Sequence, residues 1–275
     1  MYQNYFLHIL SGSILLLAML ACGSPAQTIP PTAGLDPNAI EMSIARTLEA
    51  SAKQTEQASL IPSAVSTETP TQVPKISSSG TSLVNLADGS TQFTDYVAGM
   101  QMVIPPGWLV VRVGESEYYA AWEKEATKYP IFVDIFASMQ NLDPKAFRMN
   151  AFDIRPDRLS TNDVPEIQVV FGDEDTRTLN EIRADQKRNP PPLTGYKLLS
   201  SEISETSQGI QTLNEEIQWN YTNSAGQPTT SYRKRVFFAT PGGIMAIDLL
   251  TIMDKKDLMM PDFDQVNNSI TLLTP

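Results

Sequence analysis

The chain has 275 residues and a formal net charge of -11, because 31 Asp and Glu residues outnumber 20 Lys and Arg residues. This acidity excludes nucleic acid as an expected partner, since nucleic-acid phosphates bind basic surfaces. Charged residues make up 19% of the chain and hydrophobic residues 41%, which is typical of a folded domain rather than a disordered one.

The first 21 residues predict an export signal. Residues 6–20 are mostly apolar, and the small residue Ala21 precedes the only cysteine, Cys22. His8 and residues 11–13 interrupt the apolar run, which leaves it shorter than the roughly 20 apolar residues of a membrane-spanning helix. We therefore expect residues 1–21 to direct export and to be removed.

The end of this segment, Met19-Leu20-Ala21-Cys22, resembles the lipobox of bacterial lipoproteins, in which cleavage precedes a cysteine whose thiol carries diacylglycerol. The resemblance implies lipid attachment at Cys22 and a protein held on the extracytoplasmic face of the cell membrane. Each buried methylene of an acyl chain contributes about 0.8 kcal/mol, so more than one chain holds a protein firmly. The alternative is an ordinary secretory signal, or an uncleaved N-terminal helix, with an incidental cysteine.

Residue counts also limit the chemistry of the mature chain. The only histidine, His8, lies in the expected signal, and Cys22 is the expected lipid site. Such a chain cannot form a Ser-His-Asp or Cys-His mechanism, and it cannot build a zinc site from Cys or His. We therefore expect no catalytic residue, no cofactor and no metal site, and a protein that acts by binding.

Residues 22–81 predict a tether. An Asp-Pro helix start and an apolar residue at every fourth position predict a helix over about 37–57 with a narrow apolar stripe. Residues 59–80 are rich in Ser, Thr and Pro and offer little to bury in a core. We interpret the segment as a spacer between the membrane and the next domain.

Residues 82–275 predict one globular domain, a length sufficient for a single core. Alternating apolar residues predict strands in its first half, over 93–104, 108–113, 131–138 and 166–171. A Pro-Pro-Gly turn separates the first two of these strands, and the strand over 108–113 is expected to fold back on the strand over 93–104. Helices are predicted over 143–150 and 176–188, whereas residues 115–128 fit either a helix or an extended segment.

The second half predicts four successive strands, over 197–204, 211–220, 231–240 and 244–253. A closing helix is predicted over 262–273, with Phe263, Val266 and Ile270 on its inner face. Consecutive strands joined by turns favour an antiparallel sheet. The expected fold class is therefore α+β, a mainly antiparallel sheet flanked by helices.

Two motifs resemble PsbP-like domains: Ile104-Pro-Pro-Gly-Trp108, and a final Asp-Phe-x-x-Val-x-x-Ser-Ile that ends at Ile270. The pieces that match are 102–111 and 233–273, less than half of the domain. The resemblance implies an α/β/α sandwich around an antiparallel sheet. It also implies a non-enzymatic, accessory or binding role at a membrane-bound assembly.

Two groups of acidic residues are candidate functional sites. The segment Gly172–Asp175 contains three carboxylates that could bind calcium. The alternative is a charged turn in which Asp175 caps the following helix. Glu202, Glu205, Glu215 and Glu216 could supply a carboxylate pair for glycoside hydrolysis, or they lie on a solvent-facing sheet. The ordinary structural reading is preferred for both groups.

Methionine and aromatic side chains also allow two interpretations, a binding site or core packing. The thioethers that could bind copper(I), or pack in a core, are Met100, Met102, Met245, Met253, Met259 and Met260. The aromatic residues that could mark a binding surface, or fill the core, are Trp108, Trp122 and Trp219 with Tyr118 and Tyr119. Core packing is the preferred interpretation of both sets.

The sequence thus predicts a membrane-anchored binding or accessory module with a protein partner at the membrane. The alternative is a surface protein that binds a solute or carbohydrate, or hydrolyses one with carboxylates. A partner module should expose an apolar surface without a deep pocket, whereas a ligand-binding protein should show a concave pocket with converging polar groups.

Overall fold

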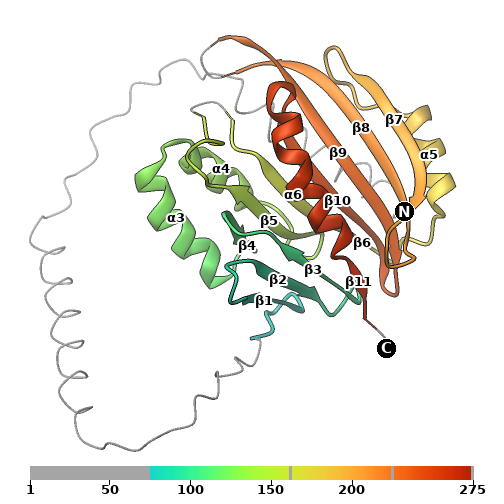
Figure 1. Cartoon of the computed structure of the whole chain (residues 1–275), viewed down its shortest axis with the longest axis horizontal. Helices are drawn as coiled ribbons and strands as arrows, with labels where there is room; N and C mark the ends of the chain where they lie inside the picture. The colour runs from blue at the N-terminus through green and yellow to red at the C-terminus, as the bar shows by residue number, and fades with distance from the viewer. Residues whose placement is uncertain (1–74, 161–162, 224–225, 274–275) are drawn as a thin grey trace, which may run out of the picture. The chain divides into compact units, whose positions relative to one another are not determined.

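The computed structural model describes residues 75–160, 163–223 and 226–273. The expected signal, Cys22 and the expected helix over 37–57 lie outside these ranges. The described residues form two antiparallel sheets and four α-helices (Figure 1). No helix within them has the length and apolar character needed to cross a membrane.

The smaller sheet has four strands, in the order β1 (Thr81–Asn85), β2 (Thr91–Asp95), β3 (Met100–Ile104) and β11 (Thr271–Leu272). In β3 every second side chain is buried, namely Met100, Met102 and Ile104. This period of two places one face of the strand against the core. β1 was not predicted, and β11 lies in a segment predicted as helix.

The single strand predicted over 93–104 is two strands separated by a tight turn. Asp95 Oδ1 accepts hydrogen bonds from the backbone N–H groups of Val97 (3.0 Å) and Ala98 (2.9 Å). Gly99 then adopts a φ of 75°, a conformation that glycine adopts without strain. Val97, an apolar residue of the strand predicted over 93–104, is exposed in this turn.

The larger sheet has seven strands. Their spatial order is β4 (Trp108–Val111), β5 (Phe147–Asp153), β6 (Glu166–Asp173), β10 (Gly243–Ile252), β9 (Pro228–Thr240), β8 (Gln211–Thr222) and β7 (Lys197–Glu205). Every strand pairing in both sheets is antiparallel. The four predicted C-terminal strands and the α+β class are confirmed. The expectation that 108–113 folds back on 93–104 is wrong, because β3 and β4 belong to different sheets.

Two predictions in the middle of the chain are wrong. The strand predicted over 131–138 is helix α4 (Ile131–Met139), which buries Phe132, Phe136 and Met139 at helical spacing. The second half of the helix predicted over 143–150 belongs to strand β5, all of whose residues are buried. There the Asp-Pro signal produces only one turn, in which the Asp143 carbonyl oxygen accepts the N–H groups of Ala146 and Phe147.

The remaining helices differ from the prediction mainly at their ends. The unsettled segment 115–128 forms α3 (Ser116–Lys128). Helix α5 (Leu179–Arg188) begins three residues later than predicted, because Thr178 and Glu181 form a capping box. A short 3₁₀ turn, η1 (Met253–Lys255), precedes α6 (Lys256–Asn268), which ends before β11 begins.

Helices cover both faces of the larger sheet. Helix α6 and the smaller sheet pack on one face, and Figure 1 shows α6 crossing the strands. On the other face α3 and α4 pack over β4 and β5, whereas α5 packs over β8 and β9. Met100, Met102, Met245 and Met259 are buried in the core beneath α6, with Met253 and Met260 packed against it. The prediction that the methionines serve as core is confirmed.

Candidate binding groove

The acidic cluster Gly172–Asp175 is a turn between β6 and α5. Asp173 and Glu174 are exposed, and Asp175 binds the Arg177 guanidinium at 2.7 Å. The expectation that Asp175 caps the helix is wrong, because Thr178 occupies that position. Among the described residues, no group of three or more His, Cys, Asp or Glu side chains is placed to hold a metal ion.

The four glutamates weighed as a carboxylate pair are not brought together. Glu202 and Glu205 are exposed on β7. Glu215 and Glu216 are neighbours on β8, so they point to opposite faces of the sheet. Glu215 is buried and accepts a hydrogen bond from Ser201 (3.1 Å), whereas Glu216 binds Lys256 (2.8 Å). The expectation of a solvent-facing position is wrong for Glu215.

The aromatic residues mostly fill the core. Trp108 and Trp219 are buried, and Trp122 is half-buried against α4. Tyr118 donates its hydroxyl to the Phe136 carbonyl, and burial raises the pKa of Tyr118 to about 12. Tyr119 alone of this set is well exposed, so these aromatics do not form a binding surface.

A row of polar side chains crosses the sheet face beneath α5, and sequence reasoning missed it. The row is formed by residues paired across neighbouring strands, namely Asn150, Gln168, Asp248, Arg235, Glu215 and Ser201. Arg235 donates through Nε and Nη2 to both carboxylate oxygens of Asp248. The signal was present in β9, where Arg233 and Arg235 alternate in step with the buried Phe237.

Two further charged groups adjoin this row, Arg233, which is buried, and Glu166, which is half-buried. Arg233 is 1% exposed, its Nε and Nη2 have no hydrogen-bond partner, and its guanidinium lies 5.4 Å from the Trp219 ring centre. Burial lowers the pKa of Arg233 to about 10. Glu166 accepts a hydrogen bond from Asn150, and burial raises the pKa of Glu166 to about 7. These charges are enclosed between layers, so they act on one another rather than on a ligand.

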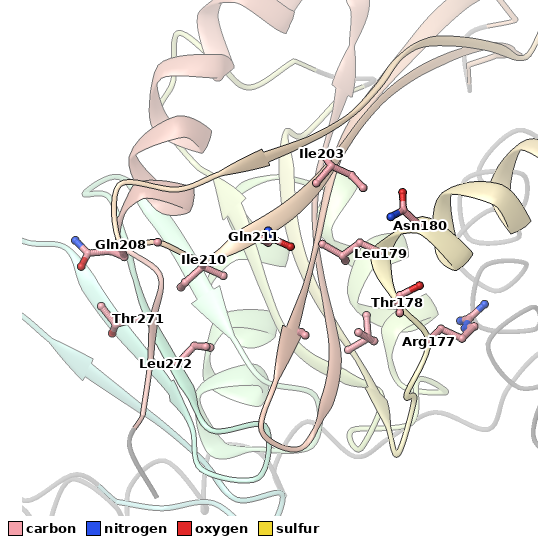
Figure 2. A pocket seen from close by; sticks show the side chains of 13 residues that line it. Arg177, Thr178, Leu179, Asn180, Ile203, Gln208, Ile210, Gln211, Thr271 and Leu272 are labelled. Carbon is pink, nitrogen blue, oxygen red and sulfur yellow. The ribbon is translucent and has the colours of Figure 1, made fainter.

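The concave surface of interest is a groove of about 970 Å³ at one end of the larger sheet (Figure 2). It runs from the start of α5, past the β7–β8 turn, to β11. Its apolar lining consists of Leu179, Ile203, Ile210, Ile244 and Leu272, and its amide side chains are Asn180, Gln208 and Gln211.

Local structure holds these side chains in place. The capping box at Thr178 fixes the first turn of α5, which carries Leu179 and Asn180. The β7–β8 turn is closed by a hydrogen bond from the Gly209 N–H to the Thr206 carbonyl (3.0 Å). At the other end, β11 is held by antiparallel pairing with β3. The groove therefore has a defined shape without a ligand.

The lining of the groove suits binding better than catalysis. No carboxylate, lysine, tyrosine, histidine or cysteine side chain lines it. Its one charged lining residue, Arg177, pairs with Asp175 and Asp185. Thr271 lines the groove as well, and its buried Oγ1 has no hydrogen-bond partner. A general acid–base pair is therefore missing from the lining, whereas apolar contacts and amide hydrogen bonds are available.

Comparisons with known proteins describe the fold only. No protein-family model matches the chain, and no curated protein sequence matches it. A similar solved structure is cyanobacterial PsbP (CyanoP) from Synechocystis sp. PCC 6803. It is 13% identical and has a TM-score of 0.41, with 68% of this chain and 94% of that chain covered.

Two further structures are similar at a comparable level. LpqN, described as involved in cell envelope biogenesis of Mycobacterium tuberculosis, is 13% identical with a TM-score of 0.36, covering 70% of this chain and 91% of that one. The Saccharomyces cerevisiae Ran-binding protein Mog1p is 10% identical with a TM-score of 0.35, covering 68% and 97%. The likeness to PsbP- and Mog1-type folds carries no argument about activity.

Proposed function

We propose that this chain is a lipid-anchored, extracytoplasmic binding module that serves a membrane-associated assembly. Cys22, directly after an apolar segment and a small residue, is the proposed lipid attachment site. The acyl chains would hold the protein at the membrane, and residues 22–81 would act as the tether. The described domain would then present its groove to a protein partner.

The observation that supports this proposal is the lining of the groove. Apolar side chains alternate there with amide groups, and the charge of its single arginine is neutralised by carboxylates. β11 is the outermost strand of the smaller sheet, so one of its edges is not paired to another strand of the described residues. An extended peptide segment could hydrogen-bond to such an edge and place its apolar side chains in the groove.

The alternative, a solute- or carbohydrate-active surface protein, has weaker support. The groove is lined by no carboxylate and no aromatic side chain. Glu215 and Glu216, the adjacent candidates for hydrolysis, lie on opposite faces of β8. We therefore propose a protein segment as the groove's ligand, and no enzymatic activity.

Membrane attachment is tested by the Cys22→Ser variant. The parent protein should stay in the membrane pellet after a carbonate wash, and the variant should move to the soluble fraction. A variant that remains in the pellet would show that something other than lipid on Cys22 holds the protein.

Partner binding is tested by cross-linking in intact cells, followed by purification of a tagged chain. Ile203→Glu and Leu272→Glu place a charge in the groove, and both parent side chains are already partly exposed. Leu199→Glu is the matched control, since Leu199 is an exposed leucine on the same strand as Ile203 but lies outside the groove. The partner should be lost with the first two variants and retained with the third. Equal recovery in all three would exclude the groove as the binding site.

A further inference from the structure

Three exposed apolar side chains lie on two adjoining segments, the first residues of the described chain and the β2–β3 turn. Ile76, Tyr96 and Val97, here called the junction patch, are 56%, 45% and 51% exposed. The Tyr96 N–H donates to the Gly80 carbonyl at 3.0 Å. A Cβ on Gly80 would lie only 2.7 Å from Val97 Cγ2. The segment that carries Ile76 therefore packs directly against the β2–β3 turn.

The patch is held by buried contacts. Arg148 donates through Nε and Nη2 to the two carboxylate oxygens of Asp95, at 2.6 and 3.0 Å, and both side chains are almost fully buried. Arg148 Nη2 also donates to the Ser79 carbonyl at 2.7 Å. Asp95 in turn holds the backbone N–H of Val97. One buried ion pair thus fixes both halves of the patch, and its apolar side chains are presented by an ordered support.

We propose that the junction patch contacts the membrane interface, as a second attachment point beside the lipid anchor. The proposal rests on the lipid anchor at Cys22 and is independent of the groove. The patch carries no charge, and the chain is acidic overall. Its contact should therefore depend on apolar burial rather than on anionic lipid. Tyrosine suits a membrane interface, because its ring is apolar and its hydroxyl is polar; in this chain the Tyr96 hydroxyl lies 3.4 Å from the Ser82 hydroxyl.

Because the patch lies close to the residues that join the domain to Cys22, even a weak contact between the patch and the membrane would be enough to keep them together. The domain is joined to Cys22 through the residues that precede Lys75. The sequence of residues 22–74 predicts a tether with a helix over about 37–57, and its coil and helical parts together span about 40 Å on average. A tether of that span holds the domain at an effective concentration of about a millimolar. Even a contact of millimolar affinity would then be occupied much of the time.

The test uses the full lipidated chain in vesicles of zwitterionic phospholipid, some carrying a nitroxide quencher high on the acyl chain. Because the Cys22 thiol would carry the lipid, Val97→Cys provides one site for an environment-sensitive dye. Leu258→Cys is the matched control, since Leu258 is exposed near the start of α6. The 13 residues of α6 span about 20 Å, and Leu273, which follows β11, donates its N–H to the Gly99 carbonyl in the β2–β3 turn. Position 258 therefore lies at the end of α6 that is farther from the patch.

The dye at position 97 should be quenched at least about threefold more than the dye at position 258, as expected for side chains inserted into the interface. Adding Tyr96→Ser and Ile76→Ser should bring the two values together while the circular dichroism spectrum is unchanged. Equal quenching at both positions in the unsubstituted background would overturn the proposal. An emission shift at position 97 without vesicles, rising with protein concentration, would also overturn it and point to self-association.

Failure of the anchor would be recognised separately. A parent chain without lipid would react with the dye at Cys22 and would not float with the vesicles. A protein that floats but shows no difference between positions 97 and 258 would retain the anchor and refute the junction patch.

Discussion

The two faces of the seven-stranded sheet are equally well buried but chemically different. On β10, Met245, Ile247 and Leu249 face α6 and the smaller sheet, and the core that they join there is formed by apolar side chains. The opposite face carries Asp248 and, on β9, Arg233 and Arg235. An apolar layer depends on shape and packing, whereas a buried charged row depends on each partner and on protonation. The two faces should therefore respond differently to substitution and to pH.

The largest effect is expected from Asp248→Ala. The change leaves the buried Arg235 guanidinium without its bidentate partner, and an uncompensated buried charge costs about 3–5 kcal/mol of unfolding free energy. Urea denaturation at neutral pH measures it. The control is the double variant Asp248→Leu with Arg235→Met, which should lie closer to the parent. If the double variant is as unstable as Asp248→Ala, packing rather than charge explains the loss.

On the apolar face, Met102→Ala should reduce the unfolding free energy by about 2–4 kcal/mol, because it leaves a cavity beside α6. The loss should be the same at pH 5 and pH 7.5, since the neighbouring core side chains do not titrate. A loss that differs by more than about 1 kcal/mol between the two pH values would mean that the two faces are coupled.

Glu166 should make the stability of the charged face depend on pH. Its pKa is about 7 in the folded chain against an ordinary value of 4.5, so the folded state binds more protons between these values. The contribution of Glu166 is therefore full below about pH 4.5 and declines as pH rises to 7. Over this range the parent should lose about 1–2 kcal/mol more than Glu166→Gln, with allowance for partial exposure.

Glutamine keeps an oxygen that can accept the hydrogen bond from Asn150, so Glu166→Gln separates titration from the loss of that contact. Burial also raises the pKa of Glu215, so the variant should retain part of the pH slope. Urea denaturation at several pH values measures both slopes. Parallel curves for the parent and Glu166→Gln would refute the assignment.

The smallest effect is expected from Arg233→Met. This substitution removes a buried cation whose Nε and Nη2 have no hydrogen-bond partner, so the variant should remain within about 1 kcal/mol of the parent or become more stable. Arg235→Met, two positions along the same strand face, is the matched control. It should be strongly destabilising, because it leaves the buried Asp248 carboxylate without its ion-pair partner. Similar losses in thermal unfolding for both variants would show that Arg233 has a partner of equal importance.

The sequence predicted best where local signals agree with the final packing. The last four strands of the larger sheet follow from alternation and from turns such as Pro241-Gly242-Gly243. The helix predicted over 176–188 is present as α5 (Leu179–Arg188), although its start is set by a Thr178–Glu181 capping box that the prediction did not use. Segment 131–139 was mistaken because Ile131 and Ile135 fit both a period of two and a period of four. Only contact of Phe132 and Phe136 with β5 favours the helix.

The groove could not be predicted, because its residues come from α5, the β7–β8 turn, β10 and β11. Leu272 fell within the closing helix predicted over 262–273, whereas it belongs to β11, a strand at the edge of a sheet. No spacing rule relates it to Leu179 or Ile203. The junction patch was missed for the same reason, since Val97 fitted a buried position in an unbroken strand.

By itself the sequence determined the acidity, the absence of histidine chemistry outside the expected signal, the lipobox-like segment and the antiparallel C-terminal strands. These follow from counts and from interactions within a few residues. The tertiary structure alone decided that β3 and β4 join different sheets and that Arg233 and Arg235 face inward. It also decided that Ile203 and Leu272 line one groove. The physical reason is that burial depends on which segments, distant in the sequence, cover a residue. Local periodicity contains no information about those segments.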